Sequence, residues 1–175
     1  MRVAGDYVHR WSGMTLPTMI GQLKRVAVMQ FDSAALDVSG DYQMVGDGGR
    51  ALVTVYVYPT NAALPVPPQS VDEGCRAEFD GVKQILVQRF PSAELLREWR
   101  ETVPRFGETP AGYAAAYEFT GNLLGPTEAV RSEAYLFCGI GGLWNVKFRV
   151  SYSQSLAGAS VAADAIAAAP TTVPQ

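Results

Sequence analysis

The stretch Ala51-Leu52-Val53-Thr54-Val55-Tyr56-Val57-Tyr58 decides the fold of this chain. Its residues are β-branched or aromatic almost throughout, which is typical of a β-strand. Successive side chains of a strand point to opposite faces of the sheet. The three valines therefore share one face, and Thr54, Tyr56 and Tyr58 share the other. Because both faces are mostly apolar, we expect a central strand that is covered on both sides.

A hairpin joins this strand to the residues before it. Tyr42-Gln43-Met44-Val45 is followed by Gly46-Asp47-Gly48-Gly49, whose residues tolerate the positive φ angles of tight hairpin turns. Closer to the N-terminus, residues 7–11 predict a short edge strand. Thr15 and Pro17 predict the start of a short helix that ends near Arg25, and the valines that follow favour another strand.

The clearest helix follows the hairpin. Ser70-Val71-Asp72-Glu73 matches a capping box, in which the Ser70 and Glu73 side chains satisfy free backbone N–H groups. Apolar residues then recur at helical spacing. The pattern predicts a helix over 71–90 with one buried face, made of Cys75, Phe79, Val82, Leu86 and Phe90.

The C-terminal half completes an α+β protein with one antiparallel sheet. Ser92 begins either a second, shorter helix or a strand. An alanine-rich helix is expected over 157–169, after three strands predicted at 113–120, 131–138 and 144–152. We expect one domain over 1–169 and a flexible tail over 170–175.

Composition argues against several classes of partner. The 14 basic and 17 acidic residues give a net charge of -3 without any basic cluster, so we expect no nucleic-acid binding. We expect no integral membrane segment, because no run of about 20 apolar residues occurs. The first residues lack the apolar core of a signal peptide. This predicts a cytoplasmic location, or a periplasmic one if a signal has been removed.

The two cysteines allow two interpretations. Cys75 lies on the buried stripe of the predicted helix, and Cys138 shares the phase of Ala134 and Leu136 in a strand. Free cysteines are among the most buried residues, so we favour two buried thiols. The alternative is a disulfide, which would add roughly 4 kcal/mol and indicate an oxidising compartment.

No pattern in the sequence indicates catalysis, a metal or a cofactor. The single histidine, His9, has no identifiable partner, and we expect it at the surface. The glycines after Cys138 join two predicted strands and therefore predict a hairpin turn instead of a phosphate loop. We expect Lys147 and Arg149 on an exposed face, where they would pair with Glu118 or Glu133. Polar side chains should thus remain scattered.

Tyrosine is the residue type most open to a functional interpretation. Strands favour tyrosine for packing alone, but aromatic side chains also anchor interfaces. We therefore predict, as a surface for a ligand or partner, Tyr56, Tyr58, Tyr113, Tyr117 and Tyr135.

The order of elements is similar to that of a known superfamily. A short helix begins at Leu16-Pro17, strands follow at Asp41-Tyr42 and 53–58, and a long helix precedes a late sheet that ends in Lys147-Phe148-Arg149-Val150. This arrangement resembles the MOG1/PsbP-like α/β/α sandwich over most of the chain. The resemblance implies an antiparallel sheet with helices packed on it, in a bacterial binding or accessory module.

Together these observations predict a non-catalytic module that binds an unidentified protein or small molecule. The alternative is a small hydrolase or ligand-processing enzyme that uses carboxylates or Cys138. An enzyme should show a concave pocket with converging titratable groups. The sequence does not determine the oligomeric state.

Overall fold

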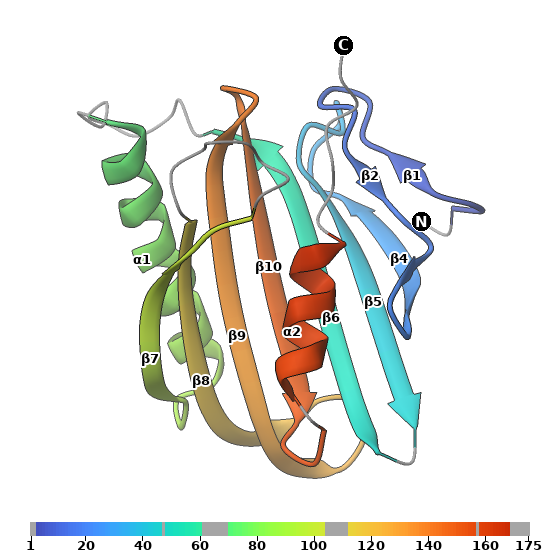
Figure 1. The fold of residues 1–175 in the computed structure, drawn as a ribbon, viewed down its shortest axis with the longest axis vertical. Helices are drawn as coiled ribbons and strands as arrows, with labels where there is room; N and C mark the ends of the chain where they lie inside the picture. Colours follow the sequence, from blue (N-terminus) through green and yellow to red (C-terminus); the bar gives the residue numbers. More distant parts are fainter. Residues whose placement is uncertain (1–2, 47, 61–69, 104–111, 157, 169–175) are drawn as a thin grey trace.

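A computed structural model describes residues 3–46, 48–60, 70–103, 112–156 and 158–168. Its centre is one antiparallel sheet of eight strands, in the order β3-β4-β5-β6-β10-β9-β8-β7 (Figure 1). The predicted tail over 170–175 and the proline-rich segment 64–68 lie outside the described residues.

The central strand β6 (Gly49–Pro59) carries the stretch that decides the fold. It pairs on one side with β5 (Val38–Gly46), as the predicted hairpin requires, and on the other with β10 (Trp144–Ser153). Its three valines are at most 1% exposed, while Thr54, Tyr56 and Tyr58 are half-buried. The prediction of a central strand is confirmed.

The C-terminal strands form a meander at one side of the sheet. β8 (Gly112–Asn122), β9 (Thr127–Ile140) and β10 are joined by hairpin turns, as predicted. The residues after Pro91 form a strand, β7 (Glu94–Glu101), so the strand alternative is correct there. A β-bulge between Leu95 and Arg97 shifts the register of β7 against β8.

The predicted helix near Thr15 is wrong. The structure instead has β2 (Thr15–Leu16), β3 (Met19–Ile20) and β4 (Leu23–Gln30). Gly21 takes a φ of +54° in the turn between β3 and β4, a conformation that suits glycine and ends regular structure. β2 also pairs with β1 (Tyr7–Val8) in a separate two-stranded sheet.

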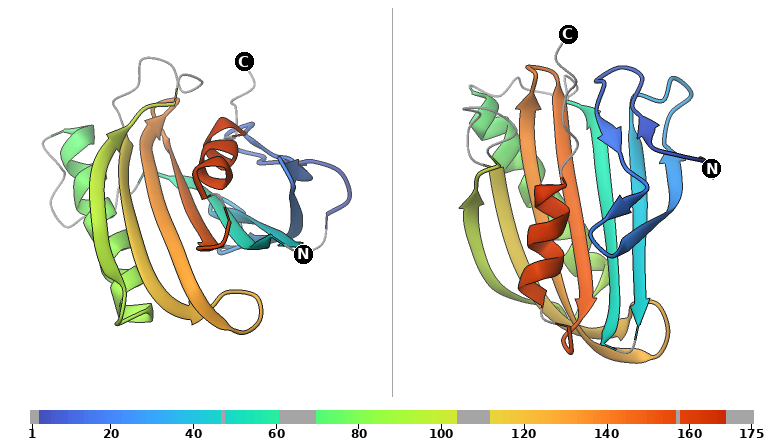
Figure 2. Two further views of the ribbon diagram at one scale, coloured as in Figure 1. Left: turned by 60° about the horizontal axis from the view of Figure 1, so that its bottom comes forward. Right: turned by 45° about the vertical axis from the view of Figure 1, so that its right-hand side comes forward.

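Two described helices cover opposite faces of the large sheet (Figure 2). α1 (Val71–Arg89) packs on β8 and β9, and its first turn is capped by Ser70, whose Oγ accepts from the Glu73 N–H at 3.1 Å. This confirms the predicted helix. α2 (Gly158–Ala167) packs mainly on β10, close to the expected C-terminal helix.

The expected α/β/α sandwich is contradicted. The structure is 53% strand and only 18% helix, so it is far richer in β-structure than a sheet with helical layers on both faces. The physical reason lies in two segments. The chain forms strands around Met19, where the α/β/α interpretation places a short helix, and after Pro91, where a helix and a strand were both predicted.

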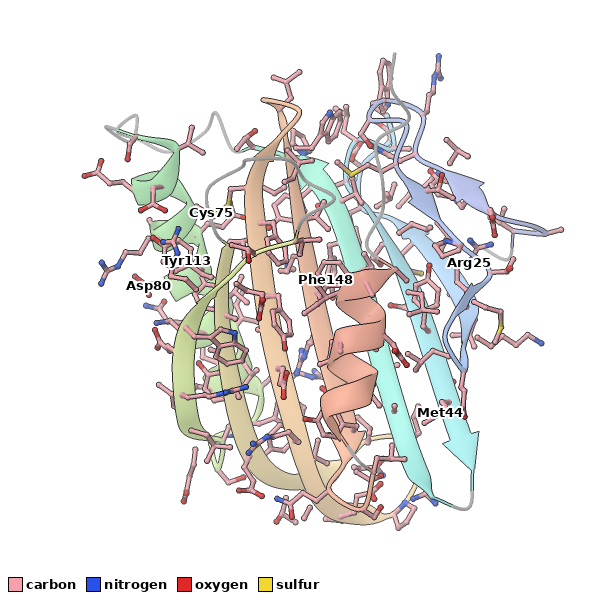
Figure 3. All side chains as sticks on the ribbon, in the orientation of Figure 1. Arg25, Met44, Cys75, Asp80, Tyr113 and Phe148 are labelled. Atoms are coloured by element: carbon pink, nitrogen blue, oxygen red, sulfur yellow. A yellow bond between two sulfur atoms is a disulfide. The ribbon has the colours of Figure 1, made fainter. Side chains whose placement is uncertain are left out.

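The two faces of the sheet carry two separate apolar cores. The α2 face has the larger core, which includes Val55, Phe148 and Tyr42. The α1 face has a smaller core around Phe79 and Leu136. Figure 3 labels a member of each, with Phe148 beside α2 and Cys75 on α1. Each core borders a cavity.

Candidate binding cavity on the α2 face

A cavity of about 640 Å³ lies between α2 and strands β7, β9 and β10. We call it the α2 cavity. Its polar and aromatic lining consists of Arg97, Trp99, Glu101, Arg131, Glu133, Tyr135 and Tyr152. Alanines and Ile166 of α2, with Val103, form an apolar wall. Titratable groups therefore converge here, contrary to the expectation that they stay scattered.

Strand register explains how these side chains meet. Glu133 and Tyr135 are two residues apart on β9 and point to the same face. Tyr152 lies on the neighbouring strand β10, opposite Arg131 of β9. The bulge in β7 places Trp99 opposite Ala114, whose side chain belongs to the α2-face core. Three strands thus direct polar groups toward one side of α2.

Glu133 is the centre of the cavity. The residue is buried, with only 6% of its surface exposed. Oε1 accepts a hydrogen bond from the Tyr152 hydroxyl at 2.9 Å, and Oε2 accepts one from the Tyr135 hydroxyl. Within the part of the chain that the structure describes, no Lys, Arg or His nitrogen forms an ion pair with this carboxylate.

The two tyrosines act as fixed donors. Burial raises the pKa of Tyr135, and the hydrogen bond to Glu133 and the negative charge of that carboxylate raise it further. The same causes, in the same order, raise the pKa of Tyr152. Both hydroxyls therefore stay protonated at neutral pH. They hold the carboxylate in place, and they are poor sources of a proton for catalysis.

Charges of both signs surround this centre. The Arg97 guanidinium lies over the Trp99 ring, 4.1 Å from its centroid. Trp99 Nε1 donates to Glu101 Oε2 at 2.8 Å, and the ring meets Tyr135 edge-on. Arg131 adds a second cation to the lining. The cavity thus offers two carboxylates, of which Glu101 accepts from Trp99, two guanidinium groups and an apolar wall, which suit recognition of a small molecule.

The predicted pairing of Glu133 with Lys147 or Arg149 is wrong. Glu133 lies opposite Val150 on β10, whereas Arg149 lies opposite Ala134. Neighbouring residues of a strand point to opposite faces, so Glu133 and the two cations are on different sides of the sheet. The sequence carried one signal for this site: an acidic residue in phase with Tyr135 and Phe137, on a face that proves to be buried.

The five predicted tyrosines do not form one surface. Tyr135 lies in the α2 cavity. Tyr56 and Tyr58 line a different cavity on the α1 face. Tyr117 is only 2% exposed in the α1-face core, and Tyr113 packs against that core. The structure therefore divides the predicted residues among two cavities and a core.

The cysteines form a disulfide. The sulfur atoms of Cys75 and Cys138 are bonded, and their Cα atoms are 5.7 Å apart. The favoured interpretation of two free thiols is therefore wrong. The bond joins α1 to β9, and it leaves no thiolate at Cys138 to act as a nucleophile. The hydrolase alternative loses one of its two proposed reactive groups.

His9 is buried, contrary to expectation, at 0% exposed. Its Nε2 lies 3.0 Å from the Ala35 carbonyl oxygen, and its Nδ1 lies 2.6 Å from the Ser12 hydroxyl. The ring also meets Trp144 edge-on. The contact with Trp144 joins this N-terminal segment to β10. Burial lowers the pKa of His9.

Comparison of the chain with protein families, with curated proteins and with solved structures finds no match. The resemblance to MOG1/PsbP-like proteins stays a prediction. Neither described helix is both long enough and apolar enough to span a bilayer. Among the described residues, no group of three His, Cys, Asp or Glu side chains is placed to hold a metal ion.

Proposed function

We propose that this protein is a non-catalytic binding module for a small zwitterionic ligand, held in the α2 cavity. The observation that carries the proposal is the buried Glu133 carboxylate, which accepts from two tyrosine hydroxyls but has no cationic partner among the described residues. A buried charge is costly unless it is paired. Its remaining lone pairs suit an ammonium group from a ligand.

The other charges of the cavity support a ligand of mixed sign. Arg97 and Arg131 line the same cavity and can bind a carboxylate through paired N–H donors. Ile166 and the alanines of α2 can cover an apolar side chain. An amino group, an acidic group and an apolar body together describe an amino acid or a short peptide end.

Binding without turnover agrees with the chemistry of the lining. None of the described lining residues is a Ser, Cys or His. The two tyrosine hydroxyls that touch Glu133 have raised pKa values and stay protonated. Attack on a bound ligand would need an activated nucleophile or a proton donor with a pKa near the working pH.

Titration calorimetry with free apolar amino acids tests this function. We expect binding of the zwitterion, and a loss of about tenfold or more for the N-acetylated form and for the amide, because each lacks one charge. Glu133→Gln should weaken binding of the free amino acid while leaving the N-acetylated form unchanged. Glu94→Gln is the matched control, since this carboxylate is exposed at the start of β7. Equal binding of the free and N-acetylated forms, or no binding of either, would contradict the proposal.

A further inference from the structure

A second set of cavities lies on the α1 face, independent of the function proposed above. Tyr56 lines three cavities there, of about 420, 210 and 80 Å³. Lys147 lines both the 420 Å³ and the 80 Å³ cavity, and Arg149 lines both the 80 Å³ and the 210 Å³ cavity. We call these three neighbouring cavities together the α1 groove. It lies between α1 and the adjoining strands β6 and β10.

The register of the sheet puts two cations on the floor of this groove. Lys147 pairs with Tyr56 and Arg149 with Thr54, all on the face toward α1. Both cations were expected at an exposed surface, but both are half-buried. The Lys147 ammonium lies 4.1 Å from the Tyr56 ring centroid and 5.5 Å from that of Tyr58. Burial lowers the pKa of Lys147 and that of Arg149.

Neither cation has an ion-pair partner among the described residues. Two acids line the groove near Lys147, namely Asp37 and Glu78. The Glu78 carboxylate already accepts from the Tyr58 hydroxyl and from Asn145 Nδ2. Burial raises the pKa of Asp37 more than the nearby charge of Lys147 lowers it, and the two side chains form no ion pair. Lys147 and Arg149 therefore lack a direct ion pair among the described residues, while the charges of Asp37 and Glu78 act on Lys147 from nearby.

The walls of the groove are apolar and partly uncovered. Phe31 stacks on Tyr56 and is still 55% exposed. From the opposite side, α1 contributes Val82 and Ile85, and Ile85 is 61% exposed. Large apolar side chains beside a cavity can gain contacts from a ligand that removes them from water.

We propose that the α1 groove binds an amphipathic carboxylate, an acid group on an extended apolar chain. The smallest cavity is lined by both Lys147 and Arg149, so it takes the carboxylate. The apolar chain extends into the largest cavity, against Phe31 and Ile85. The two cations gain a direct ion pair that no described residue gives them, and the exposed apolar walls become covered.

The first test uses the unaltered protein and two probes of equal length, decanoate and decanol. Calorimetry should show one decanoate per chain, bound at least about tenfold more tightly than decanol, because only the acid pairs with the two cations. A free amino acid should not displace decanoate, which separates this site from the α2 cavity. Equal affinities for the two probes, or no binding of decanoate, would overturn the proposal.

Substitutions then identify the cation. Lys147→Met keeps a long unbranched side chain without the charge, and it should weaken decanoate by about tenfold or more while decanol is unaffected. Lys147→Arg should retain most of the affinity, which a purely structural role would not require. Lys24→Met is the matched control, because Lys24 is exposed on β4. Unchanged decanoate affinity in Lys147→Met would refute the assignment.

Discussion

The two faces of the central sheet differ in how their helices are held and in the charge they bury. α2 is held by apolar packing of Val161, Ala162 and Ala165 on the larger core. α1 rests on a smaller core and is bonded to β9 through Cys75 and Cys138. The face with less apolar contact is therefore the one that carries a covalent crosslink.

The buried charges follow the same division. Among the described residues, the α2 face holds Glu133, an acid with hydroxyl donors and no cation in ion-pair contact, whereas the α1 face holds Lys147 and Arg149, cations without acids in ion-pair contact. Because unpaired buried charge costs free energy, each face is expected to trade stability for the ability to bind a ligand of opposite charge. This difference can be tested by experiments of decreasing effect.

Removing the crosslink should have the largest effect. Cys75→Ala with Cys138→Ala opens a loop with a sequence separation of 63 residues. We expect a loss of about 4 kcal/mol in the free energy of unfolding, measured with urea. Hydrogen exchange should increase more in α1 than in α2. A loss below about 1 kcal/mol, or equal exchange in both helices, would contradict the contrast between the faces.

Lys147→Met should have a smaller effect of opposite sign. Replacing an unpaired, half-buried cation by an apolar side chain of similar length should raise the free energy of unfolding by about 1 kcal/mol. The same urea titration measures it, with Lys24→Met as the surface control. If the variant is destabilised instead, the ammonium makes a favourable contact within the apo protein, and the α1 groove is not strained by unpaired charge.

The smallest effect concerns His9, whose segment packs on the α2-face core. Burial places its pKa in the folded state below its unfolded value of about 6.5. The unfolded chain therefore binds the proton first, so stability should fall as pH drops below about 6.5 and toward the folded pKa. His9→Gln should lack this decrease. His9 is the only histidine of the chain, so the difference between the two urea curves from pH 7 to 5 isolates it. Parallel curves would show that folding does not lower the pKa of His9.

Local sequence signals predicted the elements that depend on local physics. The cap at Ser70 and the stripe through Phe79 and Leu86 are complete within one segment, and α1 forms there. The hairpin of β5 and β6 has its turn residues and its alternation side by side. Around Met19, apolar residues fit both a helix and a strand, and pairing with β4 decided the outcome.

The candidate sites could not be predicted because they depend on what covers each face. Glu133 appears as an ordinary outward-facing acid until α2 is placed over its side of β9. The sequence around Lys147 likewise predicts a solvent-exposed strand residue, and only the packing of α1 beside it makes the side chain part of a cavity. The pairing of Cys75 with Cys138 required the helix to be positioned on that strand. Each of these features depends on contacts between segments that lie far apart in the sequence.

The position of the disulfide sets the direction in which the α1 groove can open. Cys75 lies near the first turn of α1, so that end of the helix cannot move away from β9 while the bond is intact. The last turn is held without a covalent bond, by the burial of Leu86 in the α1-face core and the stacking of Phe90 on Phe119. Any opening of α1 is therefore expected at the Arg89 end, where Phe90 would have to separate from Phe119.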